Sequence, residues 1–442
     1  MSEGKENAGL SRSIGLFALV IYGVGDMIGA GIYGTIGEAA GSMGNAVWLA
    51  FVVSMCAALL TGLTYASLAS RYPKAAGAAY VTQRAYGVKF LSYVVGLAVT
   101  ASGLSSMATG SRVFAQNLDP LISGALPIPV IFLGFIALLT IVNLRGIREC
   151  MWVNIVCTAI EVGGLLLIIA ISIPFFGKVD YLHTPAASGG LTVPMVMSGA
   201  VLAFYAFVGF EDLLNLSEEV KNPRQTMPWG IILAVGCATV IYVLVSLAAV
   251  SVVPYAALAD VKNGAPMTQI TRVAAPWIPA GLYTGITLFA VANTALMNFI
   301  MGSRLVYGMA RQGLLPSRLG VVHPTRHTPH IAILVLALIV AILAFSGNVR
   351  DLAAATSLLL LFVFGLMNAA LIILKLRPNE EKGAFEIPII VPALGALVCM
   401  SLVYSRLVHS AAGMKAPVIA VVMLAGISGL YFIMRPKTVG AE

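Results

Sequence analysis

The sequence predicts an all-α membrane protein that crosses the bilayer many times, and three observations lead to this fold class. First, 59% of the 442 residues are hydrophobic and 10% are charged, whereas soluble domains carry about 25% charged residues. Second, the apolar residues form long continuous runs, while the strands of a membrane β-barrel alternate polar and apolar residues. Third, a membrane helix needs about 20 apolar residues, so the chain has room for about a dozen of them.

Apolar runs separated by charged or Pro/Gly-rich segments predict twelve membrane spans. They cover residues 14–36, 43–69, 90–116, 127–144, 149–175, 194–217, 227–252, 278–307, 330–347, 351–374, 387–407 and 416–434. Residues 1–13 are polar and mixed in charge, and the long run after them lacks a small-residue cleavage site. We therefore predict a retained first span, not a signal peptide.

The distribution of Lys and Arg predicts the orientation of these spans. If loops alternate between two sides, the side of the N-terminus holds 19 of the 26 basic residues and the other side holds 7. Because basic loops stay in the cytoplasm, we predict that both termini are cytoplasmic and that the membrane is the inner or plasma membrane. The net charge of +8 is thus a topology signal. Nucleic acid is not a predicted partner, because no soluble domain gathers the basic residues.

The sequence offers no catalytic or metal-binding pattern, so we predict neither an enzyme nor a cofactor. It contains no P-loop, HExxH or GxSxG pattern, and no pair of its five cysteines has the spacing of a metal site. Residues 29–34 match GxGxxG, but no Asp or Glu occurs between Glu38 and Asp119. A dinucleotide site requires a preceding strand and an acid about 20 residues later. No cysteine lies in a predicted external loop, so no covalent or obligatory protein partner is predicted.

Glycines interrupt the first predicted span. Five of them lie within residues 23–34, and Asp26 stands among them. Each glycine weakens a helix by about 1 kcal/mol relative to alanine, so this segment is expected to unwind. A carboxylate within the hydrocarbon is costly and is a functional candidate by default. Asp26 is therefore expected either to cap backbone N–H groups at the break or to contact a cation.

The sixth predicted span has a second break, where Gly209 precedes the adjacent acids Glu211 and Asp212. The two breaks open two blocks of five spans each. Interrupted spans at corresponding places in two halves are typical of inverted-repeat transporters with a site at the membrane midplane. The N–H groups at a half-helix start suit a carboxylate, and the carbonyls at a half-helix end suit an ammonium or metal ion. A zwitterionic amino acid needs both.

Four stretches resemble the amino acid–polyamine–organocation superfamily of transporters. They are Ile28 to Tyr33, Tyr65 to Gly87, Phe207 to Arg224, and Ser303 to Pro316. The resemblance implies alternating access and a LeuT-like fold of two inverted five-helix repeats, with twelve transmembrane helices of which the first and sixth are broken. Residues 14–375 would form the transport core (spans 1–10), 376–434 two peripheral spans, and 1–13 and 435–442 cytoplasmic termini.

The resemblance also implies a substrate site. The substrate carboxylate would bind the N–H groups of the Gly29–Ile32 segment, and the α-ammonium would bind nearby carbonyls. Tyr205 stands where relatives place an aromatic gate, and Glu211 aligns with a gating acid. The expected substrate-binding residues are Gly25, Met27, Gly29, Ala30, Gly31, Ile32, Ser105, Tyr205, Ala206, Val208 and Asn293, with Ser106 as a further candidate.

The fifth span departs from the family pattern, because Glu161 stands where many relatives have a lysine that substitutes for a sodium ion. The hypotheses for Glu161 are a proton carrier, a ligand of a sodium-type site and a partner of a cationic substrate, beside a purely structural buried acid. By similarity, a sodium-type site would comprise Gly25, Ile28, Asn293 and Thr294. Asp26, Glu161, Tyr205 and Glu211 are thus the expected coupling or gating residues, and a proton is the first choice of coupling ion.

These observations predict a secondary active amino acid transporter that works by proton-coupled symport or exchange, with an amino acid and the lipid bilayer as its partners. Alternatives remain a sodium-coupled amino acid symporter and a polyamine or organic-cation transporter, for which the buried acids would suit extra positive charge. A membrane sensor or a channel is the alternative from another class.

Overall fold

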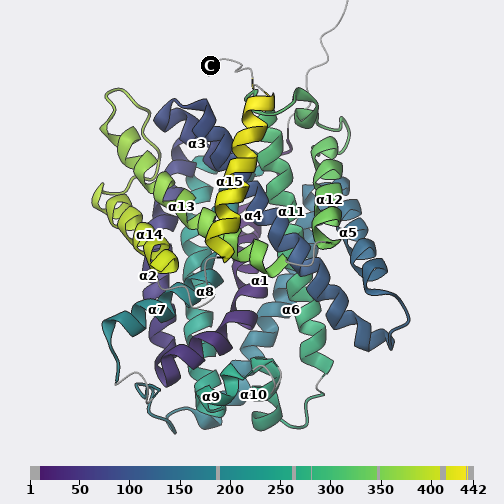
Figure 1. Ribbon diagram of the computed structural model, residues 1–442, viewed down its shortest axis with the longest axis vertical. Helices are drawn as coiled ribbons and strands as arrows, with labels where there is room; N and C mark the ends of the chain where they lie inside the picture. The colour runs from purple at the N-terminus through teal and green to yellow at the C-terminus, as the bar shows by residue number, and fades with distance from the viewer. Residues whose placement is uncertain are drawn as a thin grey trace, which may run out of the picture.

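The computed structural model describes residues 10–185, 190–260, 265–279, 281–345, 349–408, 415–434 and 436. Figure 1 shows long helices that run side by side and form one bundle. No strand occurs among the described residues, and their isolated β-bridge joins Ile14 to Val220. Most of the predicted terminal segments, residues 1–9 and 437–442, lie outside the described residues.

The α-helices of the described residues fall on the predicted spans, apart from three short helices between spans. They are α1 (Leu16–Met43), α2 (Val47–Arg71), α3 (Gly77–Tyr86), α4 (Lys89–Leu118), α5 (Ile128–Arg145), α6 (Ile147–Ser172), α7 (Val193–Phe204), α8 (Pro223–Val252), α9 (Tyr255–Ala259), α10 (Pro266–Ala274), α11 (Gly281–Arg311), α12 (His330–Phe345), α13 (Val349–Leu376), α14 (Ile390–Val408) and α15 (Lys415–Met434). By length and composition, nine segments of the described chain could each cross a membrane, and shorter apolar helices lie at 195–204, 330–345 and 390–404. The prediction of an all-helical polytopic membrane protein is confirmed. The count of twelve spans and the repeat symmetry stay predictions.

The helix bounds differ from the predicted spans in two places. α1 continues beyond residue 36 to Met43 and ends at Gly44, whose φ of 66° a helix cannot accommodate. The sixth span is a continuous α-helix only as far as Phe204. Its second half is a 3₁₀ helix, η6 (Phe210–Glu219). The short helices α3, α9 and α10 lie between predicted spans, and Figure 1 places α9 and α10 together at one end of the bundle.

α1 lies in the middle of the bundle, where it contacts α6, α7, α8 and α11. Small residues allow these close contacts. An added Cβ at Gly23 would lie 2.8 Å from the Cβ of Ala234, and one at Gly230 would lie 2.4 Å from a methyl group of Leu19. Because lipid provides no hydrophobic force between membrane helices, close packing of small residues is what brings them together. The functional candidates of α1 are therefore held against four neighbouring helices.

Backbone hydrogen bonds join the start of α1 to the end of the sixth span. The N–H groups of Ser13 and Ile14 both donate to the carbonyl of Glu219, at 2.9 and 3.0 Å, and Lys221 donates to the carbonyl of Ile14 at 2.8 Å. These two chain segments therefore lie at the same end of the bundle, as the alternation of predicted loops requires. Which side of the membrane this end faces stays a prediction.

Ion pairs fasten the loop between α13 and α14 to the ends of α2 and α13. Arg71 donates to Glu386 through Nε and Nη2, at 2.8 and 2.7 Å, and Lys375 adds a contact at 2.5 Å. Partial burial alone would raise the pKa of Glu386, but hydrogen bonds from Arg71, Lys375 and the N–H of Gly383 lower this pKa to about 2.

We expect Glu386→Gln to lower the thermal unfolding midpoint of the purified protein at pH 7, and to lower it less at pH 3. A carboxyl whose pKa is depressed in the folded state stabilises that state above its unfolded pKa of about 4.3, and the stabilisation is lost as the pH falls toward 2. Glu381→Gln is the matched control, because the Glu381–Arg224 pair is 68% and 58% exposed and 3.4 Å long and such pairs contribute little. An equal loss at both pH values would contradict this account.

Candidate functional site

The two predicted breaks meet inside the bundle. α1 is kinked at Gly29, where φ is −38° and ψ is −110°. In the sixth span, α7 ends at Phe204 and the chain turns at Gly209, whose φ of 129° favours glycine. A Cβ on Gly209 would lie 3.1 Å from the Cγ of Asp26, and one on Gly31 would lie 2.9 Å from the Cα of Ala206. The first span is thus kinked at one residue, not unwound over several, and this kink packs against the second break.

Tyr242 of α8 connects both breaks, and the sequence analysis missed it. Its hydroxyl lies 2.6 Å from the carbonyl of Met27 and 2.6 Å from that of Ala206. Since a hydroxyl has one proton, it donates to one of these carbonyls at a time. The rings of Phe51 and Phe207 pack against the Tyr242 ring, with centroids 5.7 and 5.1 Å away, so the hydroxyl is held in place.

Tyr242→Phe is expected to lower the free energy of unfolding by about 1 kcal/mol, the typical net value of one hydrogen bond, and also to slow transport. The matched control is Tyr86→Phe, which likewise removes a hydroxyl that donates to a backbone carbonyl, that of Leu366 at 2.7 Å. Tyr86 lies away from the breaks, so its variant should be less stable but should transport substrate at the normal rate. Equal transport by the two variants, measured in reconstituted vesicles, would argue against the role of Tyr242.

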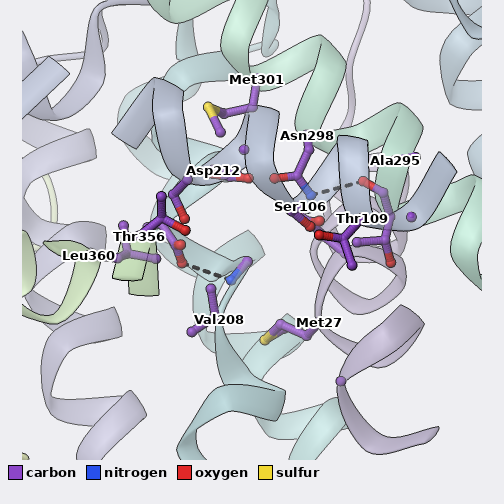
Figure 2. A pocket seen from close by; sticks show the side chains of 18 of the residues that line it. Met27, Ser106, Thr109, Val208, Asp212, Ala295, Asn298, Met301, Thr356 and Leu360 are labelled. Atoms are coloured by element: carbon purple, nitrogen blue, oxygen red, sulfur yellow. Dashed lines mark hydrogen bonds between the residues drawn. The ribbon is translucent and has the colours of Figure 1, made fainter. Parts of the chain in front are cut away.

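A cavity of about 310 Å³ opens beside the two breaks, between α1, α4, the sixth span, α11 and α13. Figure 2 shows Ser106 and Thr109 of α4 across this cavity from Asp212. The predicted site residues that line it are Asp26, Met27, Gly31, Val208, Glu211 and Thr294, together with the further candidate Ser106. Four further polar residues line the cavity that were not predicted as site residues: Ser102, Thr109, Asn298 and Thr356.

Other predicted substrate-binding residues do not line the cavity. These are Gly25, Gly29, Ile32, Ser105, Ala206 and Asn293, and Ile28 of the predicted sodium-type site does not line the cavity either. The hydroxyl of Ser105 donates to the carbonyl of Ala101 at 2.7 Å within α4, whereas its neighbour Ser106 faces the cavity. The side chains of Ala30 and Tyr205 lie outside the described part of the structure, so the aromatic gate stays a prediction.

Three acidic side chains gather where the cavity meets the breaks. Asp26, Glu211 and Asp212 are 5%, 4% and 4% exposed. One oxygen of Glu211 accepts the N–H of Gly209 at 2.8 Å, and a Cβ on this glycine would lie 3.1 Å from the Cγ of Asp26. Oδ2 of Asp26 has no hydrogen-bond partner among the described atoms.

Glu161 lies in a separate polar cluster, formed by α6 and α11 against α1. Asn154 donates to Asn293 at 3.0 Å, and Asn293 donates to Thr158 at 3.0 Å. A Cβ on Gly25 would lie 2.1 Å from the Thr158 hydroxyl oxygen, so α1 fits against this cluster only through a glycine. Glu161 is fully buried. It follows Thr158 by three residues on α6, and neither of its carboxyl oxygens has a hydrogen-bond partner among the described atoms.

This second cluster contains part of the predicted sodium-type site. Gly25 and Asn293 meet within it, and Gly29 packs against Thr294, whose hydroxyl oxygen would lie 1.8 Å from an added Cβ. Glu161 and Asn293 therefore lie together at the kinked helix without lining the cavity. Asn154 and Thr158 complete the cluster. Asn154, Thr158 and Glu161 follow one another at intervals of about one turn on α6, so they lie on the same face of this helix.

Comparison with known proteins identifies the family. Residues 14–430 match the family described as amino acid permease. The chain belongs to the amino acid permease family. It is 29% identical over 432 residues to the methylthioribose transporter of Bacillus subtilis, an alignment that covers 92% of this chain and 90% of the relative. The branched-chain amino acid permease BcaP of the same organism is 27% identical over 416 residues, with 89% and 88% covered.

A transporter from a mammal is also similar to this chain. The cationic amino acid transporter 4 of Mus musculus is 28% identical over 401 residues, which cover 85% of the permease and 62% of the mouse protein. The predicted membership of the amino acid–polyamine–organocation superfamily is confirmed. The family and these relatives are permeases and transporters, not enzymes.

The permease also contains a buried ion pair at the end of its sixth span. Nε of Arg304 on α11 lies 3.1 Å from an oxygen of Glu219, and both side chains are 0% exposed. Arg304 also donates to Asn143 of α5 at 2.7 Å and to Ser303 at 2.9 Å. From their position in the sequence at the end of the sixth span, Glu218 and Glu219 are expected to pair with loop arginines such as Arg71 or Arg304. Glu219 does pair with Arg304, whereas Arg71 pairs with Glu386.

Proposed function

We propose that the permease is a secondary active amino acid transporter that works by alternating access around the cavity. One observation carries the proposal: the two interrupted spans face each other at the cavity, with Asp26, Met27 and Gly31 of one and Val208 and Gly209 of the other in its wall. Interrupted helices supply free backbone groups where a regular helix would supply none.

Both halves of an α-amino acid find partners in this arrangement. Beyond the kink at Gly29, the N–H groups of the segment up to Ile32 begin the second half of α1, where the helix dipole favours an anion. Before the kink, the carbonyl of Met27 faces that of Ala206, and Tyr242 donates to either one. An α-ammonium can take over a carbonyl that Tyr242 leaves free, since each carbonyl has two lone pairs.

The proposal includes the wider architecture. The first ten spans would form two inverted five-helix repeats in the LeuT-like arrangement, with α14 and α15 peripheral. In Figure 1, α14 lies at the edge of the bundle and α15 lies over its front. The permease would reside in the plasma membrane with both termini in the cytoplasm, as the distribution of its basic residues favours.

The coupling ion in this proposal is a proton, which Glu161 binds and releases. The charged form of a carboxyl group is costly inside a membrane protein, and the Glu161 oxygens have no ordinary hydrogen bond among the described atoms. The group also reaches α1 through its neighbours Asn293 and Thr158, so its protonation can affect the kinked helix. Sodium remains the alternative, since Gly25 and Asn293 lie in the same cluster.

Uptake by reconstituted vesicles tests the proposed function. We expect saturable accumulation of at least one radiolabelled amino acid under an inward proton gradient. Accumulation that follows a sodium gradient and ignores the pH gradient would replace the proton by sodium. Vesicles that show no saturable uptake of any amino acid would reject the transporter and favour a sensor.

A further inference from the structure

We infer that the cavity selects basic amino acids, with Asp26 and Asp212 binding the cationic group of the side chain. The inference rests on the proposed function, since it names the substrate of the same site. Its first support is the charge of the cavity. Asp26, Glu211 and Asp212 all line it, and no Lys, Arg or His does so among the described residues. The buried Arg304 is paired with Glu219 and does not line the cavity.

No positively charged side chain of the described residues faces these three acids at the cavity. Glu211 accepts a hydrogen bond from the neutral N–H of Gly209, and this contact brings no positive charge to the site. Burying a carboxylate without a counter-charge is costly. A neutral amino acid brings one ammonium and one carboxylate, so it leaves the charge of the site unchanged. A basic amino acid adds one positive charge.

The geometry offers a place for this positive charge. Asp26 is 5% exposed and lines the cavity, and its Oδ2 atom has no hydrogen-bond partner among the described atoms. Figure 2 shows Asp212 opposite Ser106 and Thr109, and Asp26 packs against Gly209, three residues before Asp212. An ammonium or guanidinium donor at this point gains charge-assisted hydrogen bonds, which are about twice as strong as neutral ones.

A carboxylate on the substrate is still required. Gly31 also lines the cavity, and it belongs to the segment that starts the second half of α1. A diamine would satisfy the acids but would bring no anion to these N–H groups. A lysine-like substrate satisfies both ends of the site, and this decides between a basic amino acid and a polyamine.

Lysine and norleucine provide the matched pair of ligands, because they differ by the terminal ammonium group alone. We expect the full-length purified protein to bind lysine about tenfold or more tightly than norleucine, as the loss of a charge-assisted contact predicts. Binding is measured by competition against radiolabelled lysine, and putrescine is the third competitor. Asp212→Asn should remove most of the preference for lysine and leave norleucine binding in place. Asp119→Asn, which lies outside the cavity, should change neither.

The outcomes separate the inference from the proposed function. Equal binding of norleucine and lysine by the unmodified protein, together with amino acid uptake, overturns the inference and leaves the transporter intact. Tighter binding of putrescine than of lysine overturns the need for a carboxylate and with it the basic amino acid. If vesicles take up no amino acid, the proposed function itself fails. Because the ligand comparison uses the unmodified protein, the test does not depend on the folding of a variant.

Discussion

Replacing Arg304 by methionine is expected to lower the free energy of unfolding of the permease by about 3–5 kcal/mol, the usual effect of removing one partner of a buried ion pair. Arg304 and Glu219 are both 0% exposed, so Glu219 would keep a buried charge without a partner. Asn143 would also lose its donor, since its side-chain oxygen accepts from Arg304 at 2.7 Å. Unfolding of the purified protein, followed by denaturant titration in mixed micelles, measures the loss.

The double variant Arg304→Met/Glu219→Leu is the decisive control for this prediction. A buried ion pair replaced as a whole by apolar residues often costs little, so the double variant should recover most of the lost stability. If it is as unstable as the single variant, the loss comes from packing and not from an unpaired charge. Arg224→Met tests the other extreme, because Arg224 belongs to an exposed pair and should have no measurable effect.

The spans and their interruptions could be predicted from the sequence because both depend on local composition. Long apolar runs predict membrane helices whatever surrounds them, and the helices of the structure fall on those runs. Gly209 and the glycines around Asp26 weaken a helix by a local mechanism. The extent of the first break was less predictable, since packing against neighbouring helices keeps α1 helical on both sides of Gly29.

Contacts between spans could not be predicted from the sequence with the same success. Adjacent helical residues point about 100° apart, so a small rotation of α4 decides whether Ser105 or Ser106 faces the cavity. Both are serines in an apolar run with no strongly polar face to fix the rotation, and the structure selects Ser106. Tyr242 was missed for the same reason. Its position in an apolar span gives no sign that its hydroxyl reaches two carbonyls of other helices.

The structure separates the buried acids into two groups, which could not be distinguished from the sequence. Asp26, Glu211 and Asp212 share the cavity, whereas Glu161 lies outside it, beside Asn293 and Thr158. This division is consistent with two tasks, one for the substrate and one for a coupling ion. Asp26 follows directly after Gly25, and Gly25 packs against the Glu161 cluster. A change of protonation at Glu161 therefore has a short physical route to the substrate site.

Glu161→Gln is expected to abolish the accumulation of substrate under a pH gradient and to preserve exchange of substrate across the membrane. Glutamine has nearly the size of glutamate and can occupy the same space on α6, but it cannot take up or release a proton. Exchange requires no net proton movement, so the cavity and the two breaks should continue to cycle with substrate bound. Reconstituted vesicles measure both activities, with gradient-driven uptake in one assay and counterflow against preloaded substrate in the other.

The control for this variant is Glu149→Gln, because Glu149 is exposed and lies in the first turn of the same helix α6. It should keep both activities. Loss of both activities in Glu161→Gln, with the protein still folded, would mean that Glu161 holds α6 to α1 and carries no proton. Full gradient-driven accumulation would exclude Glu161 as the coupling residue. Of the described acids, Asp26 would then be the next to test, because it lines the cavity and its Oδ2 atom has no hydrogen-bond partner among the described atoms.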